Sequence, residues 1–329
     1  MSTRSFLIDT LCACCLSSFA AEPVQADMDP LTLYAVRSTP VGHVRGAKAD
    51  RNALRVPLRS DVVLVVDLNT GDELLAKNPQ RVVPIASITK LMTALVVLQT
   101  RAPLDEVLTI ASDDVDRLKN SSSRLQIGVR LTRREMLQLA LMSSENRAAH
   151  ALARSQPGGE SEFIADMNAT ARQLGMYSTS FTDPTGLSPS NQSTARDLAR
   201  LVRAASKVPL LSQLSTMSQH SVSFGRRRLL YRNTNRLIHR DDWDIKLQKT
   251  GFINEAGKCL AMQTRIGVRS LVMILLDGRG PSVRVRDAEN IRRWLRMNPA
   301  GRGHQVPRAN GSLPSARTDH QIRGRFDRR

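Results

Sequence analysis

Residues 84–90 have the sequence Pro84-Ile85-Ala86-Ser87-Ile88-Thr89-Lys90 and open a strongly apolar segment that continues to about Thr100. We predict that this segment is a helix, in which Ser87 and Lys90 lie on the same face, one turn from each other. A serine hydroxyl is a weak nucleophile and needs a base within hydrogen-bond reach. Lys90 can be that base if burial and neighbouring positive charge lower its pKa. Alone, the spacing is more typical of a helix cap and a solvated lysine.

Strand patterns lie near both ends of the chain. The β-branched run 62–66, the turn residues 69–72 and the segment 73–76 predict a hairpin. Residues 260–266 and 271–276 predict a second hairpin around a glycine.

Another strand pattern precedes this second hairpin. Ile245 and Leu247 alternate with polar residues up to Lys249-Thr250-Gly251, where we expect a strand to end.

The middle of the chain, about residues 104–205, has helical patterning. A capping box at Thr132-Arg133-Arg134-Glu135 starts one helix, and Ser143-Ser144-Glu145-Asn146 interrupts the pattern. Asp183-Pro184-Thr185-Gly186-Leu187 is interpreted as a structural turn. A last helix is predicted at about 283–297. This order favours one antiparallel sheet covered by helices, with an inserted helical subdomain and a cleft between the two.

The composition indicates an anionic environment. The chain has 329 residues and a formal net charge of +18, with basic residues concentrated near 226–240 and in the tail. Aromatic residues make up only 4%, so the stacking surfaces of a single-strand nucleic-acid binder are scarce. We therefore expect peripheral contact with an anionic wall polymer or membrane, and not nucleic-acid recognition. The six histidines lack metal-ligand spacing, so neither a metal nor a cofactor is predicted.

The first 26 residues resemble a secretory signal. Arg4 precedes the largely apolar residues 6–21, which Asp9 interrupts, and Val24-Gln25-Ala26 offers a cleavage site. We predict export to the periplasm; a disordered start or a misplaced initiation site is the alternative.

Two further boundaries follow from composition. Residues 27–54 are predicted to be an extended lead-in, and residues 298–329 a basic disordered tail. Removal of the signal would leave Cys259 as the one cysteine, so no intrachain disulfide is expected.

Three short motifs carry a family resemblance: Ser87-Ile88-Thr89-Lys90, Ser144-Glu145-Asn146 and Lys249-Thr250-Gly251. With their flanking residues they resemble the low-molecular-mass penicillin-binding proteins, in particular the D-alanyl-D-alanine endopeptidase branch of the serine DD-peptidases. The resemblance covers about residues 55–297. It implies a β-lactamase/transpeptidase-like α/β (α+β) fold, with a five-stranded antiparallel sheet flanked by helices and an all-helical subdomain at about 104–205.

The resemblance implies a role for each motif. Ser87 would attack the carbonyl between two D-alanine-type residues and form an acyl-enzyme that water resolves. Lys90 would take the serine proton, and repulsion by Lys249 would favour its neutral form. Ser144 would relay a proton to the leaving amine. Asn146 would hold both Lys90 and the substrate amide.

Further residues are implied to bind the substrate. Lys249 and Thr250 would hold its carboxylate end, and Gly251 would let an extended peptide pair with the strand edge. The backbone N–H groups of the nucleophile and of Phe252 would bind the oxyanion. Arg286 resembles the arginine that meets the substrate carboxylate in related carboxypeptidases. The implied partners are peptidoglycan stem peptides, with β-lactams as covalent inhibitors.

One departure decides between peptidase and lactamase. Glu145 stands where β-lactamases carry aspartate, and no Glu-x-x-x-Asn pattern of class A enzymes follows before Lys249. Acyl-enzymes formed with β-lactams are therefore expected to persist. The preferred interpretation is an endopeptidase that cleaves cross-links. The alternatives are a carboxypeptidase, a class A-type β-lactamase and a catalytically silent binder of anionic polymer.

Overall fold

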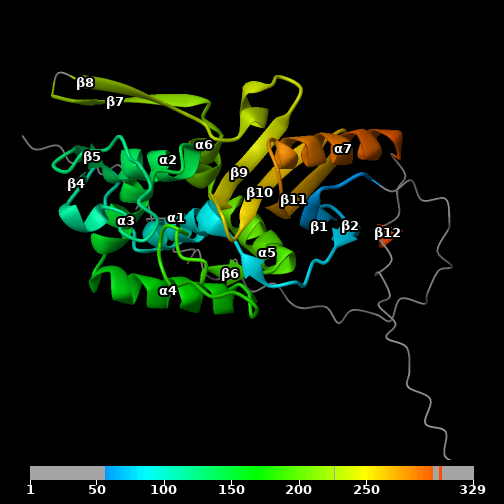
Figure 1. Cartoon of the computed structure of the whole chain (residues 1–329), viewed down its shortest axis with the longest axis horizontal. Coiled ribbons are helices and arrows are strands. Elements are labelled where there is room, and N and C mark those ends of the chain that lie inside the picture. Colours follow the sequence, from blue (N-terminus) through cyan, green and yellow to red (C-terminus); the bar gives the residue numbers. More distant parts are fainter. Residues whose placement is uncertain (1–55, 226, 299–303, 306–329) are drawn as a thin grey trace, which may run out of the picture. The chain divides into compact units, whose positions relative to one another are not determined.

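The computed structural model describes residues 56–225, 227–298 and 304–305 (Figure 1). The predicted signal at 1–26, the lead-in at 27–54 and most of the predicted tail lie outside these residues, so those three assignments stay predictions. The limits of the peptidase domain and of its helical subdomain stay predictions as well.

The main sheet contains both predicted hairpins. Strands β1 (Ser60–Asp67) and β2 (Glu73–Lys77) are antiparallel, and so are β10 (Gly257–Ile266) and β11 (Arg269–Gly278). The sheet order is β12-β2-β1-β11-β10-β9. The predicted five-stranded antiparallel sheet is therefore confirmed, and a two-residue strand, β12 (His304–Gln305), lies parallel to β2 beside it.

Strand β9 (Asp244–Ile253) is the edge of this sheet on the side of the third motif. The prediction that the strand ends at Gly251 is wrong, because Gly251 pairs with Cys259 and the pairing with β10 continues to Ile253. The Lys-Thr-Gly motif therefore lies within a paired strand, which fixes its backbone.

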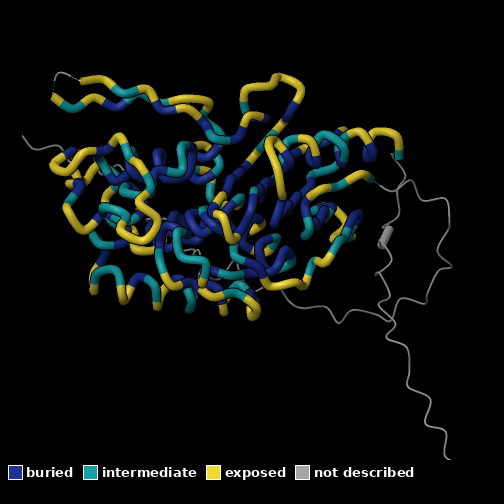
Figure 2. Tube along the Cα trace, in the orientation of Figure 1, coloured by how far each residue is buried: buried dark blue, intermediate teal, exposed yellow. Residues whose placement is uncertain are grey.

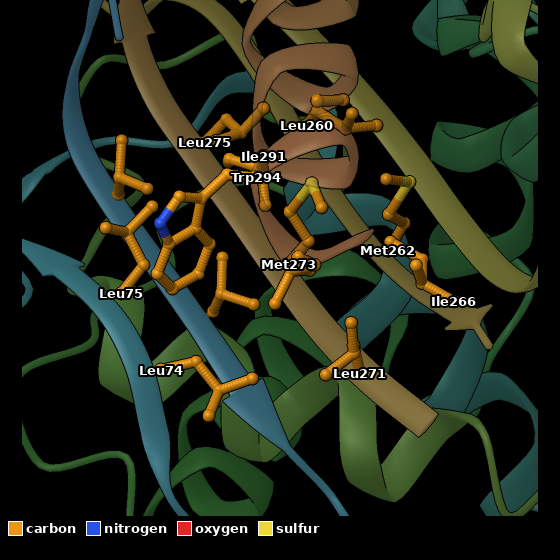
Figure 3. Close-up of a cluster of buried hydrophobic side chains, with 14 of the residues drawn as sticks. Leu74, Leu75, Leu260, Met262, Ile266, Leu271, Met273, Leu275, Ile291 and Trp294 are labelled. Carbon is orange, nitrogen blue, oxygen red and sulfur yellow. The ribbon is translucent and has the colours of Figure 1, made fainter. Parts of the chain in front are cut away.

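Two helices cover opposite faces of the sheet (Figure 1). Helix α7 (Val283–Met297) packs Ile291 and Trp294 onto Met273 and Leu275 in a buried cluster (Figure 3). Helix α5 (Ala195–Ala205) contacts β1, β11 and β10 on the other face. Both faces are thus removed from water, which agrees with the nearly continuous apolar runs of the central strands.

The part of the chain between β2 and β9 is mainly helical, as predicted. Its helices are α1 (Thr89–Gln99), α2 (Arg133–Met142), α3 (Asn146–Arg154), α4 (Gly159–Gln173), α5 and α6 (Pro209–Thr216). Its shorter elements are β3 (Val83–Pro84), η2 (Ala86–Ile88), β4 (Val107–Thr109), η3 (Ser112–Asp114), β5 (Arg130–Thr132), β6 (Gln192–Ser193), β7 (Gln219–Phe224), β8 (Arg227–Arg232) and η4 (Arg236–His239). Within the described ranges, no helix is both long and apolar enough to span a membrane.

Helix α1 is the centre of this helical part. Every residue from Thr89 to Val97 is buried, and the helix contacts α2, α3, α4 and α5. An apolar surface around the whole circumference is typical of a helix with neighbours on all sides. The elements that flank α1 therefore determine what its first turn meets.

Local signals set the ends of the neighbouring helices. The predicted capping box at the start of α2 is confirmed: Thr132 Oγ1 accepts the amide N–H of Glu135, and the Glu135 carboxylate accepts the amide N–H of Thr132. Helix α2 ends at Met142 and α3 begins at Asn146. The residues between them form a tight loop that contains Ser144 and Glu145 of the second motif, whose last residue, Asn146, begins α3.

Candidate active site

Ser87 lies in the short 3₁₀ turn η2, directly before α1. Ala86 has φ 48°, a left-handed conformation in which the chain turns sharply ahead of the serine. Lys90 lies in the first turn of α1, and its Nζ is 2.9 Å from Ser87 Oγ. The structure therefore places the two side chains of the first motif within hydrogen-bond distance.

The side chain of Lys90 is fully buried. Its Nζ donates to Asn146 Oδ1 at 2.7 Å and to the Thr185 carbonyl at 2.6 Å. A neutral amine has two N–H groups and one lone pair. With both N–H groups occupied by these acceptors, the lone pair faces Ser87 Oγ, where it can accept the hydroxyl proton.

Burial lowers the pKa of Lys90 to about 7. The carboxylates of Asp183, Glu145 and Asp116 act in the opposite direction and raise it. The expectation that repulsion by Lys249 is the cause is not supported; the chief cause is removal of the amine from water. A neutral fraction of Lys90 is thus available near neutral pH.

The second and third motifs meet beside this pair. Lys249 Nζ donates to Ser144 Oγ at 2.9 Å and to the Thr250 carbonyl at 2.8 Å. Ser144 has φ 62°, a left-handed conformation that turns the loop between α2 and α3. Thr250 Oγ1 lies 2.5 Å from Thr234 Oγ1. The predicted pair Ser87–Lys90 and the pair Ser144–Lys249, which the structure adds, therefore lie in one region.

Lys249 is also fully buried, and its pKa lies well below the ordinary value. Burial is the main cause, and the positive charges of Lys90 and Arg284 add to it. The charged form of Lys249 is therefore less favourable than that of a lysine in water. A carboxylate arriving beside it would supply the missing counter-charge and raise its pKa.

Two glycines allow the chain to close around the nucleophile. A Cβ on Gly251 would lie 2.9 Å from the Ile85 carbonyl oxygen and 3.2 Å from the Ser87 nitrogen. A Cβ on Gly186, which has φ +80°, would lie 2.0 Å from the Ala86 carbonyl oxygen. Glycine is therefore required at both positions for the observed backbone approach.

The turn at residues 183–187 belongs to the site, although the sequence was interpreted there as a structural turn only. The Asp183 carboxylate accepts the amide N–H groups of Thr185 at 2.6 Å and of Gly186 at 2.7 Å. This holds the Thr185 carbonyl against Lys90. The Asp-Pro-Thr-Gly sequence of this turn is the feature that could have identified it as part of the site.

The structure does not bring Arg286 to this cluster. Its Nη2 donates to the Pro281 carbonyl, and the exposed side chain lines a hollow together with Pro57. Arg284 instead reaches the motif strand, where its Nη1 donates to the Gly251 carbonyl at 3.1 Å. Residues two apart on a helix point in nearly opposite directions, so only one of the two arginines can face β9.

The remaining predicted site residue, Phe252, follows Gly251 on β9. Its side chain is 52% exposed, and the Lys258 ammonium lies 3.9 Å from the ring centroid. A pocket of about 400 Å³ is lined by residues that include Asn146 and Thr185, the two other hydrogen-bond partners of Lys90. Among the described residues, no group of His, Cys, Asp and Glu is arranged to hold a metal ion.

A serine beside a buried lysine, a second serine beside a second lysine, and a glycine-containing strand edge define a serine acyl-transfer site. A model of peptidase family S11, described as D-alanyl-D-alanine carboxypeptidase, matches residues 48–280. The chain belongs to this family and is a serine-type peptidase, so the family resemblance is confirmed.

Individual relatives agree with this assignment. The chain is 51% identical over 244 residues to a D-alanyl-D-alanine endopeptidase of Pseudomonas aeruginosa, covering 74% of this chain and 79% of the relative. It is 44% identical over 265 residues to a D-alanyl-D-alanine endopeptidase of Escherichia coli, covering 80% and 85%.

Solved structures share the fold. The Streptomyces K15 DD-transpeptidase matches with a TM-score of 0.67 and 27% identity, covering 72% of this chain and 97% of that one. A D-alanyl-D-alanine carboxypeptidase from Mycobacterium tuberculosis matches with a TM-score of 0.67 and 27% identity, covering 75% and 95%. The predicted transpeptidase-like fold is confirmed.

Proposed function

We propose that this protein is a D-alanyl-D-alanine endopeptidase that cleaves peptidoglycan cross-links through an acyl-enzyme on Ser87, and that penicillins acylate the same oxygen. The observation that carries the proposal is the position of Lys90 Nζ, which lies 2.9 Å from Ser87 Oγ and has Asn146 Oδ1 and the Thr185 carbonyl as further partners, so that the neutral amine can accept the serine proton. The names of the two relatives given above support the choice of substrate.

In the acylation step, the Ser87 hydroxyl proton passes to Lys90 as Oγ bonds to the substrate carbonyl carbon. The backbone N–H groups of Ser87 and Phe252 stabilise the resulting oxyanion. When the C–N bond breaks, Ser144, which is hydrogen-bonded to Lys249, passes its proton to the leaving amine and takes up in return the proton that Lys90 received from Ser87, so that both groups regain their starting protonation states. Water then attacks the ester and releases the acid, which restores the Ser87 hydroxyl.

Substrate binding uses the same region. A carboxylate at the leaving-group end of the substrate would lie against Lys249 and Thr250, where it favours protonation of Lys249. Gly251 on the sheet edge leaves room for an extended peptide to pair with β9. Asn146 would hold the substrate amide as well as Lys90. Arg284 holds the carbonyl of Gly251 and thereby supports this edge.

The pH dependence of acylation tests the role of Lys90. Only the neutral amine accepts a proton, and its pKa is about 7. The second-order rate constant for acylation by benzylpenicillin is therefore expected to fall about tenfold per pH unit below 7 and to level off above it. Stopped-time labelling between pH 5.5 and 9 measures this, with circular dichroism to verify folding at each pH. A rate that does not change with pH would contradict the role.

The substrate class is tested with defined muropeptides. Wild-type protein is expected to convert cross-linked dimers to monomers faster than it removes the terminal D-alanine from linear pentapeptides, as followed by liquid chromatography. The second candidate is the carboxypeptidase activity that the family description names. Exclusive trimming of the linear pentapeptide would establish that activity instead. Fast, catalytic hydrolysis of nitrocefin would favour a β-lactamase.

The environment proposed for the enzyme is the periplasm. The relatives named above are bacterial, the first 26 residues resemble a signal, and the net charge of +18 favours peripheral contact with anionic wall material or membrane.

A further inference from the structure

A two-stranded hairpin extends from the rim of the site. Strands β7 and β8 are antiparallel and lie along α2 (Figure 1), and much of the hairpin surface is exposed (Figure 2). Strand β8 carries Arg227, Arg228 and Arg232. Their arrangement relative to the site indicates more.

One face of this hairpin is basic and contains no acidic residue. Arg228, Leu230 and Arg232 alternate along β8, so their side chains share a face, and all three are exposed. The residues opposite them on β7 are Ser223, Ser221 and Gln219. Among the described contacts, the guanidinium groups of Arg228 and Arg232 have no carboxylate partner. Two arginine side chains are thus available to an anionic ligand.

The end of β8 that carries Arg232 lies beside the active site. The Arg232 carbonyl accepts the Ser143 hydroxyl at 3.3 Å, next to the second motif. Two residues later, the Thr234 amide donates to the Met142 carbonyl at 3.0 Å, and Thr234 Oγ1 contacts Thr250 of the third motif. Strand β8 therefore leads outward from the groups that would hold the substrate.

Arg124 fastens the hairpin in this position. Its Nη1 donates to the Leu230 carbonyl at 2.9 Å, and its guanidinium lies 4.0 Å from the centroid of the Tyr231 ring. Alternate residues of a strand are about 6.7 Å apart, so Arg232 and Arg228 are separated by about 13 Å along β8. This spacing suits a peptide that carries carboxylates at intervals better than it suits one small anion.

We propose that the basic face of β8, formed by Arg228 and Arg232, is a subsite for the carboxylates of the second stem peptide in a cross-linked substrate. The proposal rests on the endopeptidase function given above and adds a reason for preferring cross-linked over linear peptides. Arginine pairs with carboxylates through two parallel N–H···O bonds. A single exposed apolar side chain, that of Leu230, interrupts the row, which makes a lipid surface the weaker candidate.

The test replaces both arginines, as R228Q together with R232Q. Because each exposed pair contributes up to ~1 kcal/mol, kcat/KM for the cross-linked dimer is expected to fall roughly tenfold. Hydrolysis of linear pentapeptide and acylation by benzylpenicillin should change less than twofold. Raising the salt concentration should reduce dimer cleavage by the wild type more than by the variant. The matched control, R172Q with R203Q, removes two exposed charges from α4 and α5 and should leave all three rates unchanged.

Several results would overturn the proposal. One is unchanged dimer cleavage in the R228Q/R232Q variant. A second is an equal fall in the rates of dimer cleavage, pentapeptide hydrolysis and acylation by benzylpenicillin. Another is co-sedimentation with phosphatidylglycerol vesicles that the variant loses while dimer cleavage persists, which would assign the face to lipid. A wild-type protein that reacts with penicillin but never cleaves the dimer would refute the endopeptidase function itself, and is recognised before any variant is made.

Discussion

Replacement of Ser87 by alanine is expected to abolish covalent labelling by a fluorescent penicillin and to lower peptidase activity by about 10⁴-fold or more. Ser87 Oγ is the hydroxyl that contacts Lys90 Nζ, so its removal leaves the base without a nucleophile. Alanine fits the same 3₁₀ turn, and the melting temperature should stay close to that of the wild type.

The control for this variant is Ser206→Ala. Ser206 caps the end of α5, where its hydroxyl donates to the Arg203 carbonyl. The substitution removes a hydrogen-bonded serine hydroxyl outside the site, so labelling should be unaffected. Gel fluorescence after incubation with the penicillin measures both variants. Labelling that survives in Ser87→Ala would remove Ser87 from the role of nucleophile.

The second large effect is expected for Lys90→Met. Methionine has a similar length and suits a buried position, but it cannot accept a proton. Loss of the base should slow acylation by benzylpenicillin about 10³-fold, within the range typical of general base catalysis. Asn146 Oδ1 and the Thr185 carbonyl each lose a donor, at a cost of about 1–3 kcal/mol for such a group. Part of this cost is offset because the variant no longer has to bury an amine away from water.

Lys246→Met separates loss of the base from loss of a lysine. Lys246 lies on β9, where it is exposed and pairs with Asp244 at 2.6 Å. Its replacement should leave the acylation rate unchanged. Rapid-mixing measurements of the acylation rate, together with thermal unfolding of both variants, distinguish a chemical defect from a folding defect. A near-normal rate in a folded Lys90→Met protein would show that another group takes the serine proton.

Local signals in the sequence were sufficient for much of the fold. Helix α7 occupies residues 283–297 as predicted, because its apolar positions recur at helical spacing. The capping box at Thr132 and the turn between β1 and β2 are equally local, since each depends on side chains within a few residues. For these three elements, whose signals are contained in short segments, the prediction was confirmed.

Features that depend on distant segments were not accessible in this way. The Thr185 carbonyl lies 95 residues from Lys90 in the chain, yet it fixes the orientation of the amine. The continuation of β9 past Gly251 depends on pairing with β10, and the choice between Arg284 and Arg286 depends on how α7 is rotated on the sheet. The low pKa of Lys90 is likewise a consequence of tertiary burial, not of the neighbouring Lys249.

The two glycines around Ser87 have a consequence for the molecule as a whole. Gly186 comes from the helical part and Gly251 from the sheet edge, and each brings backbone against backbone beside the nucleophile. No rotamer change can absorb a displacement at such a junction. The backbone geometry of the turn that carries Ser87 is therefore sensitive to the alignment between these two parts. Remote substitutions that tilt one part against the other are expected to change the acylation rate before they lower thermal stability.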